Sequence, residues 1–454
     1  MCGELSFLPF MTTARKQIVI TDFGAVPDGA TNNAVAIQKA IDACAAGGGG
    51  RVVVPAGGVF VSGKLFLRSR VELHMEHAAT LLCSGEIEDV TQGKKPDRPQ
   101  ELACGWICAE DGEDIAITGL GVIDGNGRAY IAADDPYIYK MPDIRPLTFF
   151  IAGCKRVNIE GITIRDGAHW TVWLVGCDDV LVSRIRIYND LKLPNNDGID
   201  IDRCRNVRIS DCFIECGDDA ICLKTMRRFE KYGHSENIIV HGCTLKSTST
   251  AFCIGCEVSA PIRNVVVDSC IITSSHRGLS INHSFESDVE NVLFTNILIE
   301  TRLFDDRWWG MGEPIYVKSL PWTEYDRVGT VRHVRFQNIR ARSENGVLVH
   351  GETAERIQDL EFENVHIELA KWSKWPGGRL DLRPCPRKMD GRDEGVVSHP
   401  THGFLLRNAT DVTLRNCGVS WSGEVPDYFK GAMEVEGVEN LVVEGFRESI
   451  KYKG

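Results

Sequence analysis

Three aspartates form the densest group of potentially reactive side chains in the sequence. Asp197 lies in PNNDGIDID (194–202), and Asp218 and Asp219 lie in CGDDAICLKT (216–225), with Asp218 placed 21 residues after Asp197. Carboxylates that crowd together repel one another, so at least one of them should keep a proton near neutral pH. A protonated carboxyl beside ionised ones can serve as a general acid next to a general base. We therefore take these three aspartates as the candidate catalytic residues.

The elements that must position these aspartates belong to a sequence repeat. A turn, then Asn or Asp, then alternating apolar residues recur, for example in CKRVNIEGITI (154–164), CDDVLVSRIRI (177–187) and CRNVRISDCFI (204–214). The first apolar residues of six successive copies are spaced by 23, 27, 31, 27 and 27 residues: Val157, Val180, Val207, Ile238, Val265 and Val292. Larger steps of 42 and 52 residues further on indicate long insertions or a degenerate copy.

The repeat predicts an all-β fold, a right-handed parallel β-helix. Each copy holds two or three short strands and no amphipathic helix, which argues against a βα barrel. A period near 27 residues is typical of a solenoid, in which each coil buries its inward side chains by stacking on its neighbours. Residues 17–454 are expected to form one such domain, after an N-terminal extension at 1–16.

Two segments interrupt the repeat. A helix at about 33–46, N-capped by Thr31, would place Ala34, Ile37, Ile41 and Cys44 on one face and cap the first coil. A loop insertion is expected at about 300–322, in ETRLFDDRWWGMGEPIYVKSLPW.

The repeat also predicts where the aspartates meet. Because 21 residues are close to one coil, Asp197 and Asp218 are expected on adjacent rungs, about 4.8 Å apart at the backbone, with Asp219 alongside. Asn and Asp also fill turns elsewhere in the solenoid, which is the alternative explanation. That explanation accounts for one Asp per coil, but not for Asn-Asn-Asp-Gly stacked beneath Gly-Asp-Asp.

Over nearly its whole length the chain resembles glycoside hydrolase family 28, the polygalacturonases and their relatives. The resemblance rests on ITDFGAVPDGATNNAVAIQKAI, on ITGLGVIDGNGRAY, and on NND-G followed by GDD. It implies an inverting hydrolysis in which Asp218 protonates the leaving oxygen while Asp197 and Asp219 activate the attacking water.

Two family motifs are altered in this chain. Thr250 stands where the family has the His of Gly-His-Gly, and a rival alignment to His276 lies about two coils too late. The family's Arg-Ile-Lys triplet, which grips a uronate carboxylate, falls on Ser280, Ile281 and Asn282, so both cations are lost. We therefore expect retained hydrolysis and an altered preference for the sugar.

Further residues are expected to contact an oligosaccharide. Trp308 and Trp309 suit stacking on sugar rings, with Arg302, Arg307 and Glu313 as polar neighbours. A loop that covers one edge of the solenoid, or a subunit contact, is the alternative. The predicted substrate-binding residues are Asn195, Lys224, Glu257, Asn282, His283, Arg302, Trp308, Trp309 and Glu313.

The expected function is an exo-acting glycosidase on pectin-related or other plant cell-wall oligosaccharides. A pectate-lyase-like eliminating enzyme and a non-catalytic carbohydrate-binding solenoid are the alternatives. The net charge of −12 disfavours nucleic acid as a partner, and the absence of a long apolar run disfavours a membrane span. Seventeen cysteines without a recognisable signal peptide favour reduced thiols and a cytoplasmic location. We expect no metal or cofactor, and a homo-oligomer is left open.

Overall fold

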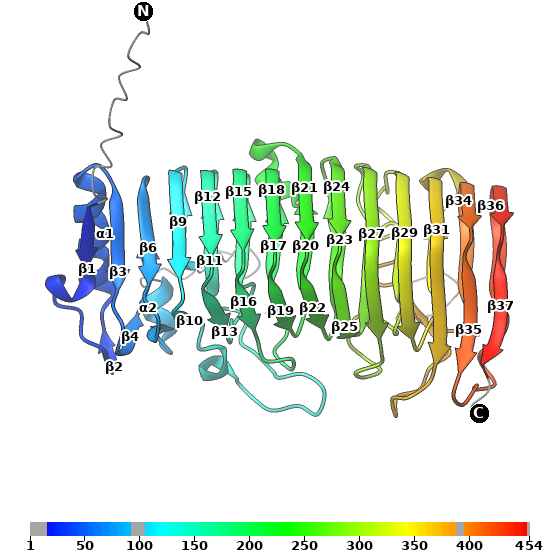
Figure 1. Cartoon of the computed structure of the whole chain (residues 1–454), viewed down its shortest axis with the longest axis horizontal. Coiled ribbons are helices and arrows are strands. Elements are labelled where there is room, and N and C mark those ends of the chain that lie inside the picture. The colour runs from blue at the N-terminus through cyan, green and yellow to red at the C-terminus, as the bar shows by residue number, and fades with distance from the viewer. Residues whose placement is uncertain (1–15, 92–104, 387–394, 452–454) are drawn as a thin grey trace, which may run out of the picture.

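The computed structural model describes residues 16–91, 105–386 and 395–451. The chain winds into a long stack of coils whose strands run side by side from one end of the molecule to the other (Figure 1). Thirty-five strands join in one continuous sheet, and they pair in parallel from coil to coil. The parallel β-helix is therefore confirmed. The predicted extension at 1–16 lies outside the described residues, apart from Lys16.

Each regular coil contains three strands, and each strand pairs with its equivalent in the next coil. The coil that follows Asp197 consists of β17 (Ile199–Asp202), β18 (Arg205–Ser210) and β19 (Phe213–Cys216). It stacks on β20 (Ile221–Thr225), β21 (Ser235–His241) and β22 (Thr244–Ser247). The repeat of two or three strands read from the sequence is thus one turn of the helix.

The alternation of apolar residues builds the core. The six residues used to measure the period stack in register, from Val157 to Val292, and all are buried. Further along the stack, the rings of Phe294, Phe336 and Phe362 continue the core with centroids 4.8 and 5.1 Å apart. Each coil thus covers the apolar face of its neighbour, as a solenoid requires.

The recurring Asn has its own structural reason. Asn206, Asn237 and Asn264 each adopt a left-handed backbone, with φ of 55°, 59° and 57°. Asn tolerates this conformation better than most residues with a side chain. Their amides also form a ladder, since Nδ2 of Asn237 donates to Oδ1 of Asn206 at 3.1 Å and Nδ2 of Asn264 donates to Oδ1 of Asn237 at 3.0 Å.

The long steps in the repeat are insertions and not degenerate coils. β27 (Val289–Thr301) pairs directly with β29 (Val331–Ser343), and β31 (Ile357–Ala370) pairs directly with β34 (Phe404–Arg415). The predicted loop at 300–322 is too long at both ends, because residues 300–301 complete β27 and β28 (Ile315–Ser319) is a regular strand. The second insertion contains an antiparallel hairpin, β32 (Arg379–Asp381) and β33 (Val396–Ser398).

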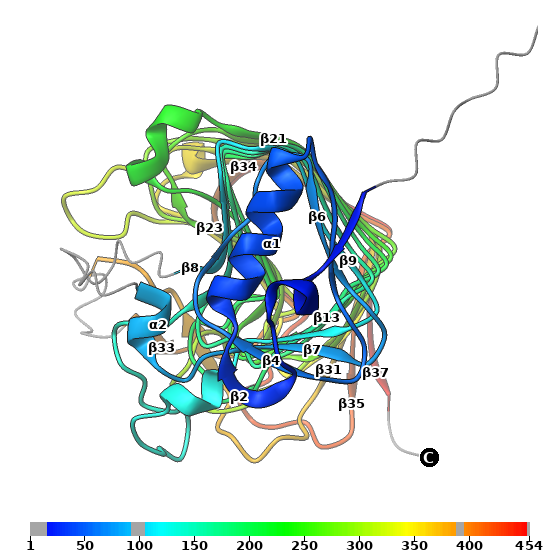
Figure 2. The ribbon, with the colours of Figure 1, turned by 90° about the vertical axis from the view of Figure 1, so that its left-hand side faces the viewer.

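Helix α1 (Ala34–Ala46) lies across the N-terminal end of the stack (Figure 2). Its residues Ile37, Ile41 and Cys44 are buried against the first coil, so the capping helix is confirmed. The capping role of Thr31 is wrong, because its hydroxyl donates to Asp28 at 2.7 Å and the helix starts later. Among the described residues, no helix combines the length and apolarity needed to cross a bilayer.

Candidate active site

The three candidate carboxylates meet where two coils begin. Ile199 of β17 lies opposite Ile221 of β20, so Asp197 and Asp219, each two residues earlier, occupy equivalent positions on neighbouring coils. The N–H of Gly198 donates to the carbonyl of Asp219 at 2.9 Å and fixes this register. One carboxylate oxygen from each of the three aspartates lies within 4.8 Å of the others. Their predicted proximity is confirmed, with Asp219 and not Asp218 opposite Asp197.

Asn196 holds the turn in which these aspartates sit. Its side chain donates to the carbonyl of Asp190 at 2.8 Å and accepts the N–H of Gly217 at 2.7 Å. A Cβ on Gly217 would come within 2.4 Å of the carbonyl of Leu193, so only glycine fits there. Asn196 therefore ties one coil to the next immediately before Asp218.

Asp218 has the environment of a carboxyl that keeps its proton. Its Oδ2 accepts the backbone and side-chain N–H groups of Asn195 at 3.2 and 3.4 Å, and its Oδ1 accepts the N–H of Asp219 at 3.1 Å. Burial, followed by the charge of Asp219, raises the pKa of Asp218 to about 7. A carboxyl with that pKa can donate a proton at neutral pH.

Asn195, predicted to bind substrate, is occupied by protein groups. Its Oδ1 accepts from Nη2 of Arg145 at 2.8 Å, while its Nδ2 faces Asp218. Arg145 also donates to the carbonyl of Pro194 at 3.0 Å. Sequence reasoning missed Arg145, which lies 50 residues before Asn195 in a segment with no recognisable motif.

Two buried aspartates lie at the base of the site. Burial and then the charge of Asp200 raise the pKa of Asp197 well above its usual range. Asp200 is fully buried, and neither of its carboxylate oxygens accepts a hydrogen bond from a described residue. Burial raises the pKa of Asp200 well above its usual range too. Asp200 was missed because an Asp within IDID looks like one more turn residue.

Lys224 places a positive charge next to these carboxyls. Its Nζ lies 4.0 Å from Oδ1 of Asp200 and 3.8 Å from Oε2 of Glu257, and 5.2 Å from the centre of the Trp170 ring. The predicted residues Lys224 and Glu257 are therefore brought together beside the aspartates. Trp170 was not predicted, although its half-exposed ring is a surface on which a sugar can stack.

Comparisons with known proteins identify the family of the chain. Residues 44–375 match the model of Glycosyl hydrolases family 28. The chain belongs to this family. A probable polygalacturonase from Vitis vinifera is 28% identical over 279 residues, covering 58% of this chain and 56% of that protein. This chain spans about half the length of the curated relatives it matches.

Solved structures of family 28 proteins show the same fold. The hyperthermoactive exopolygalacturonase from Thermotoga maritima has a TM-score of 0.62 at 23% identity, covering 81% of this chain and 89% of that chain. The family 28 exopolygalacturonase from Yersinia enterocolitica has a TM-score of 0.66 at 19% identity, covering 94% and 78%. The predicted right-handedness of the β-helix is thereby confirmed.

The altered family 28 motifs can now be placed. Phe252 lies opposite Ile221, so Thr250 occupies on the next coil the position of Asp219. Thr250 in turn lies opposite Arg277, one coil further on, and His276 therefore belongs to that later coil. This register places Thr250, and not His276, on the coil that directly follows Asp219. His276 is fully buried, with Nδ1 3.2 Å from the carbonyl of Thr248.

Ser280 and Asn282, which the resemblance to family 28 aligns with two cations, lie on the coil that pairs with β23 (Thr250–Val258). Both are buried, and neither Oγ of Ser280 nor Oδ1 of Asn282 has a hydrogen-bond partner among the described residues. Lys318 lies opposite Asn282 on the next coil. Lys318 is fully buried, and its Nζ bonds to Ser284 and to backbone carbonyls of the second insertion, including that of Pro384.

Two predicted substrate contacts are wrong. Glu313 is buried and pairs with Nε of Arg277 at 3.3 Å, because it lies opposite Arg277 on the next coil and neutralises it. His283 is buried between the hydroxyl of Ser319 at 3.0 Å and the carbonyl of Ser287 at 2.6 Å, so both ring nitrogens are in use. Each residue is fully buried, and its side chain is engaged by protein groups.

The loop between β27 and β28 folds back onto the site. Nε1 of Trp308 donates to the carbonyl of Gly217 at 3.2 Å, next to Asp218. The guanidinium of Arg383 lies over the ring of Trp309, with its carbon 4.8 Å from the ring centre. Both tryptophans are half-buried. Arg302 lies over Phe304, and no contact in the described part of the chain joins it to the aspartates.

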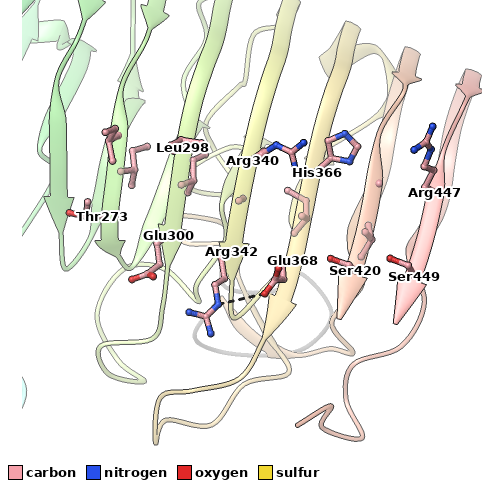
Figure 3. Close-up of a pocket in the computed structure, with 17 residues that line it drawn as sticks. Thr273, Leu298, Glu300, Arg340, Arg342, His366, Glu368, Ser420, Arg447 and Ser449 are labelled. Carbon is pink, nitrogen blue, oxygen red and sulfur yellow. Dashed lines mark ion pairs between the residues drawn. The ribbon is translucent and has the colours of Figure 1, made fainter. Parts of the chain in front are cut away.

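The described residues also form a groove and two groups of possible metal ligands, none of which contains all three aspartates. A groove of about 730 Å³ crosses the outer face of the late coils, with Arg342 and Glu368 paired 3.8 Å apart within it (Figure 3). Two more groups have metal-ligand geometry: Asp219 with Cys222 and Cys253, and His399 with His402 and Glu434. Burial raises the pKa of Cys222 well above its usual range, which opposes the thiolate that a metal needs.

Proposed function

We propose that this protein hydrolyses a glycosidic bond with inversion of configuration. Asp218 protonates the leaving oxygen, and Asp197 and Asp219 hold the water that attacks the anomeric carbon. The observation that carries this proposal is the buried Asp218, whose pKa of about 7 lets it hold a proton at neutral pH beside two further carboxyls. The reaction adds one water across the broken bond. Asp218 gives its proton to the leaving oxygen, and the aspartate pair takes a proton from the attacking water. Exchange with solvent then returns a proton to Asp218 and removes one from the pair.

The spacing of the carboxylates bears on stereochemistry. Carboxyl groups about 5–5.5 Å apart usually retain configuration, while groups ~6.5–9.5 Å apart usually invert it. The aspartate oxygens here lie within 4.8 Å, nearer to the retaining value. We still favour inversion, because Asp197 and Asp219 stack in register and together can hold one water. A retaining enzyme needs only one carboxylate as nucleophile, and not such a pair.

We further propose exo action on a pectin-related oligosaccharide. The Trp308 loop is hydrogen-bonded to the turn at Gly217, next to Asp218, and we infer that it limits how far a substrate chain can extend past that side. The two solved relatives named above are both exopolygalacturonases. A chain end that enters beside Trp308 would then present its terminal sugar to Asp218.

We propose that the reacting sugar is neutral, or that its charged group is at a different position from the carboxylate of galacturonate. Ser280 and Asn282 supply a hydroxyl and an amide where the family supplies two cations, and Arg277 is already paired with Glu313 and Asp381. A buried carboxylate without a charged partner is strongly disfavoured.

Comparing kcat/KM on trigalacturonate with kcat/KM on rhamnose-ended or neutral pectic oligosaccharides tests this specificity. Clear preference for trigalacturonate would contradict it. An unsaturated product would instead indicate elimination, and binding without turnover would indicate a carbohydrate-binding solenoid.

A further inference from the structure

A second cluster of ligand-type side chains lies at the far end of the molecule from α1. His399 and His402 stand between β33 and β34, and Glu434 stands near the start of β36 (Met433–Glu444). Nε2 of His399 lies 3.3 Å from Oε1 of Glu434, and Nδ1 of His402 lies 3.1 Å from Oε2. One donor atom from each residue lies within 4.8 Å of the others.

Each histidine nitrogen lies from one oxygen of Glu434 at about the distance that separates neighbouring ligands of a tetrahedral zinc ion. With Zn–N and Zn–O bonds of about 2.0–2.2 Å, neighbouring ligand atoms stand roughly 3.3 Å apart. Two imidazoles and one carboxylate form a common zinc ligand set, which leaves a fourth position for water. Imidazole also selects zinc over calcium or magnesium, which prefer oxygen ligands.

The histidines are oriented as ligands. Nδ1 of His399 lies 2.6 Å from the carbonyl of Pro400, which can only accept, so this nitrogen carries the proton and Nε2 offers its lone pair. Metal-bound histidines usually donate their other N–H in this way. Nδ1 of His402 is buried and, despite its closeness to Glu434, makes no aligned hydrogen bond to any described residue. A cation between the three side chains would satisfy that nitrogen.

A guanidinium competes for the same position. Nη2 of Arg407 lies 2.9 Å from Nε2 of His399 and 3.0 Å from Oε1 of Glu434. Its Nε is also 3.0 Å from Oε2 of Glu436, opposite Arg407 on β36. Arg407 can therefore keep Glu436 as its partner when a metal takes its place on Glu434.

The cluster joins the second insertion to the last coils. The N–H of His399 donates to the carbonyl of Gly378 at 2.9 Å, at the base of the β32–β33 hairpin. Asp381 of that hairpin accepts the N–H of Gly310, in the Trp308 loop, at 2.8 Å. A metal at this cluster would hold a hairpin that in turn supports the loop over the candidate active site.

We propose that His399, His402 and Glu434 bind Zn²⁺, with water in the fourth position, and that the bound ion fastens this insertion to β36. The sequence had led us to expect no metal. The site is independent of the proposed hydrolysis, so it can be tested by binding and stability alone.

The test is calorimetric titration of chelator-treated, full-length protein with Zn²⁺. One equivalent should bind and raise the melting temperature. His399→Ala and His402→Ala each remove a ligand and should weaken binding by more than the ~10–100-fold that loss of an outer-shell partner costs, and Arg407→Ala should tighten it by removing the competitor. Glu434→Gln, which keeps the side-chain volume, should weaken it in the same way if an alanine variant fails to fold. His333→Ala, which removes an exposed histidine paired with Asp359, is the matched control and should bind as wild type.

Two results would overturn the proposal. One is the absence of stoichiometric binding to the folded wild-type protein. The other is binding that persists in the His399→Ala/His402→Ala double variant, which would place the metal elsewhere. Titration with Co²⁺ identifies that second location, since thiolate ligation at Cys222 and Cys253 gives an intense charge-transfer band that nitrogen and oxygen ligands lack.

Discussion

Asn195 donates two N–H groups to a single oxygen of Asp218, one from its backbone at 3.2 Å and one from its side chain at 3.4 Å. The other oxygen of Asp218 accepts the N–H of Asp219. These bonds fix the orientation of the carboxyl, whereas burial keeps its pKa high. The backbone N–H of Asn195 thus both orients the proposed acid and lowers its pKa, and burial more than offsets that lowering.

Replacing Asp218 by Asn should abolish turnover and leave the fold intact. Asn is nearly isosteric with Asp but cannot transfer a proton, and general acid catalysis typically contributes ~10²–10⁴-fold. The measurement is kcat on the best pectic oligosaccharide, with circular dichroism to check folding. Asp359→Asn, at an exposed position remote from the site, is the control. A folded Asp218→Asn variant with a near-wild-type rate would sink the acid assignment.

The pH profile should report the acid. Because the pKa of Asp218 is about 7, kcat/KM should fall as pH rises above 7, approaching tenfold per pH unit. The charge of Lys224 lowers this pKa, so Lys224→Met should move the basic limb to higher pH, whatever it does to KM. A flat profile from pH 7 to 9, or a limb that Lys224→Met leaves in place, would speak against this role for Asp218.

Asp200→Asn should stabilise the protein, and more at high pH. Burial raises the pKa of Asp200 in the folded state above its ordinary 3.8, so the folded protein binds a proton that the unfolded chain releases. Stability is therefore lost as pH rises from 3.8 toward the folded pKa, by about 1.4 kcal/mol per pH unit. Asn never ionises and escapes this loss.

Urea unfolding of wild type and Asp200→Asn at pH 5 and pH 8 measures the effect. The free-energy advantage of the variant should be larger at pH 8. An equal difference at both pH values would show that Asp200 is not held in its neutral form.

The repeat made the fold predictable because register follows from side-chain alternation. The positions from Val157 to Val292 are periodic in sequence and stack in the structure. The aspartate group was predictable for the same reason, since one coil separates Asp197 from the Gly-Asp-Asp segment. The detail that Asp219 lies opposite Asp197 depends on the exact length of the coil, which the average period does not define.

Residues brought in by insertions were not predictable in this way. Arg145 lies outside the repeat and meets Asn195 only through the path of a long loop. Asp381 arrives from the second insertion to face Arg277. Glu313 was misread as a substrate contact because its loop looked exposed, although its register places it on Arg277. Such contacts depend on loop conformation, for which the sequence carries no periodic signal.

Arg277→Met should destabilise the protein by ~3–5 kcal/mol, because it leaves Glu313 without its buried partner. Glu313→Gln keeps the shape and leaves Arg277 with Asp381, so its cost should be smaller. Urea unfolding measures both variants, with KM determined in parallel. A Glu313→Gln variant of unchanged stability and strongly raised KM would restore Glu313 as a substrate contact.

The most direct test of the proposed mechanism is to observe by proton NMR the anomer that is first released from a pectic oligosaccharide. Hydrolysis with Asp218 as acid, and with water held by Asp197 and Asp219, predicts that the new reducing end appears first with the configuration opposite to that of the cleaved bond, before mutarotation. A product that first appears with retained configuration would contradict the account, because one of the aspartates would then have to act as a nucleophile.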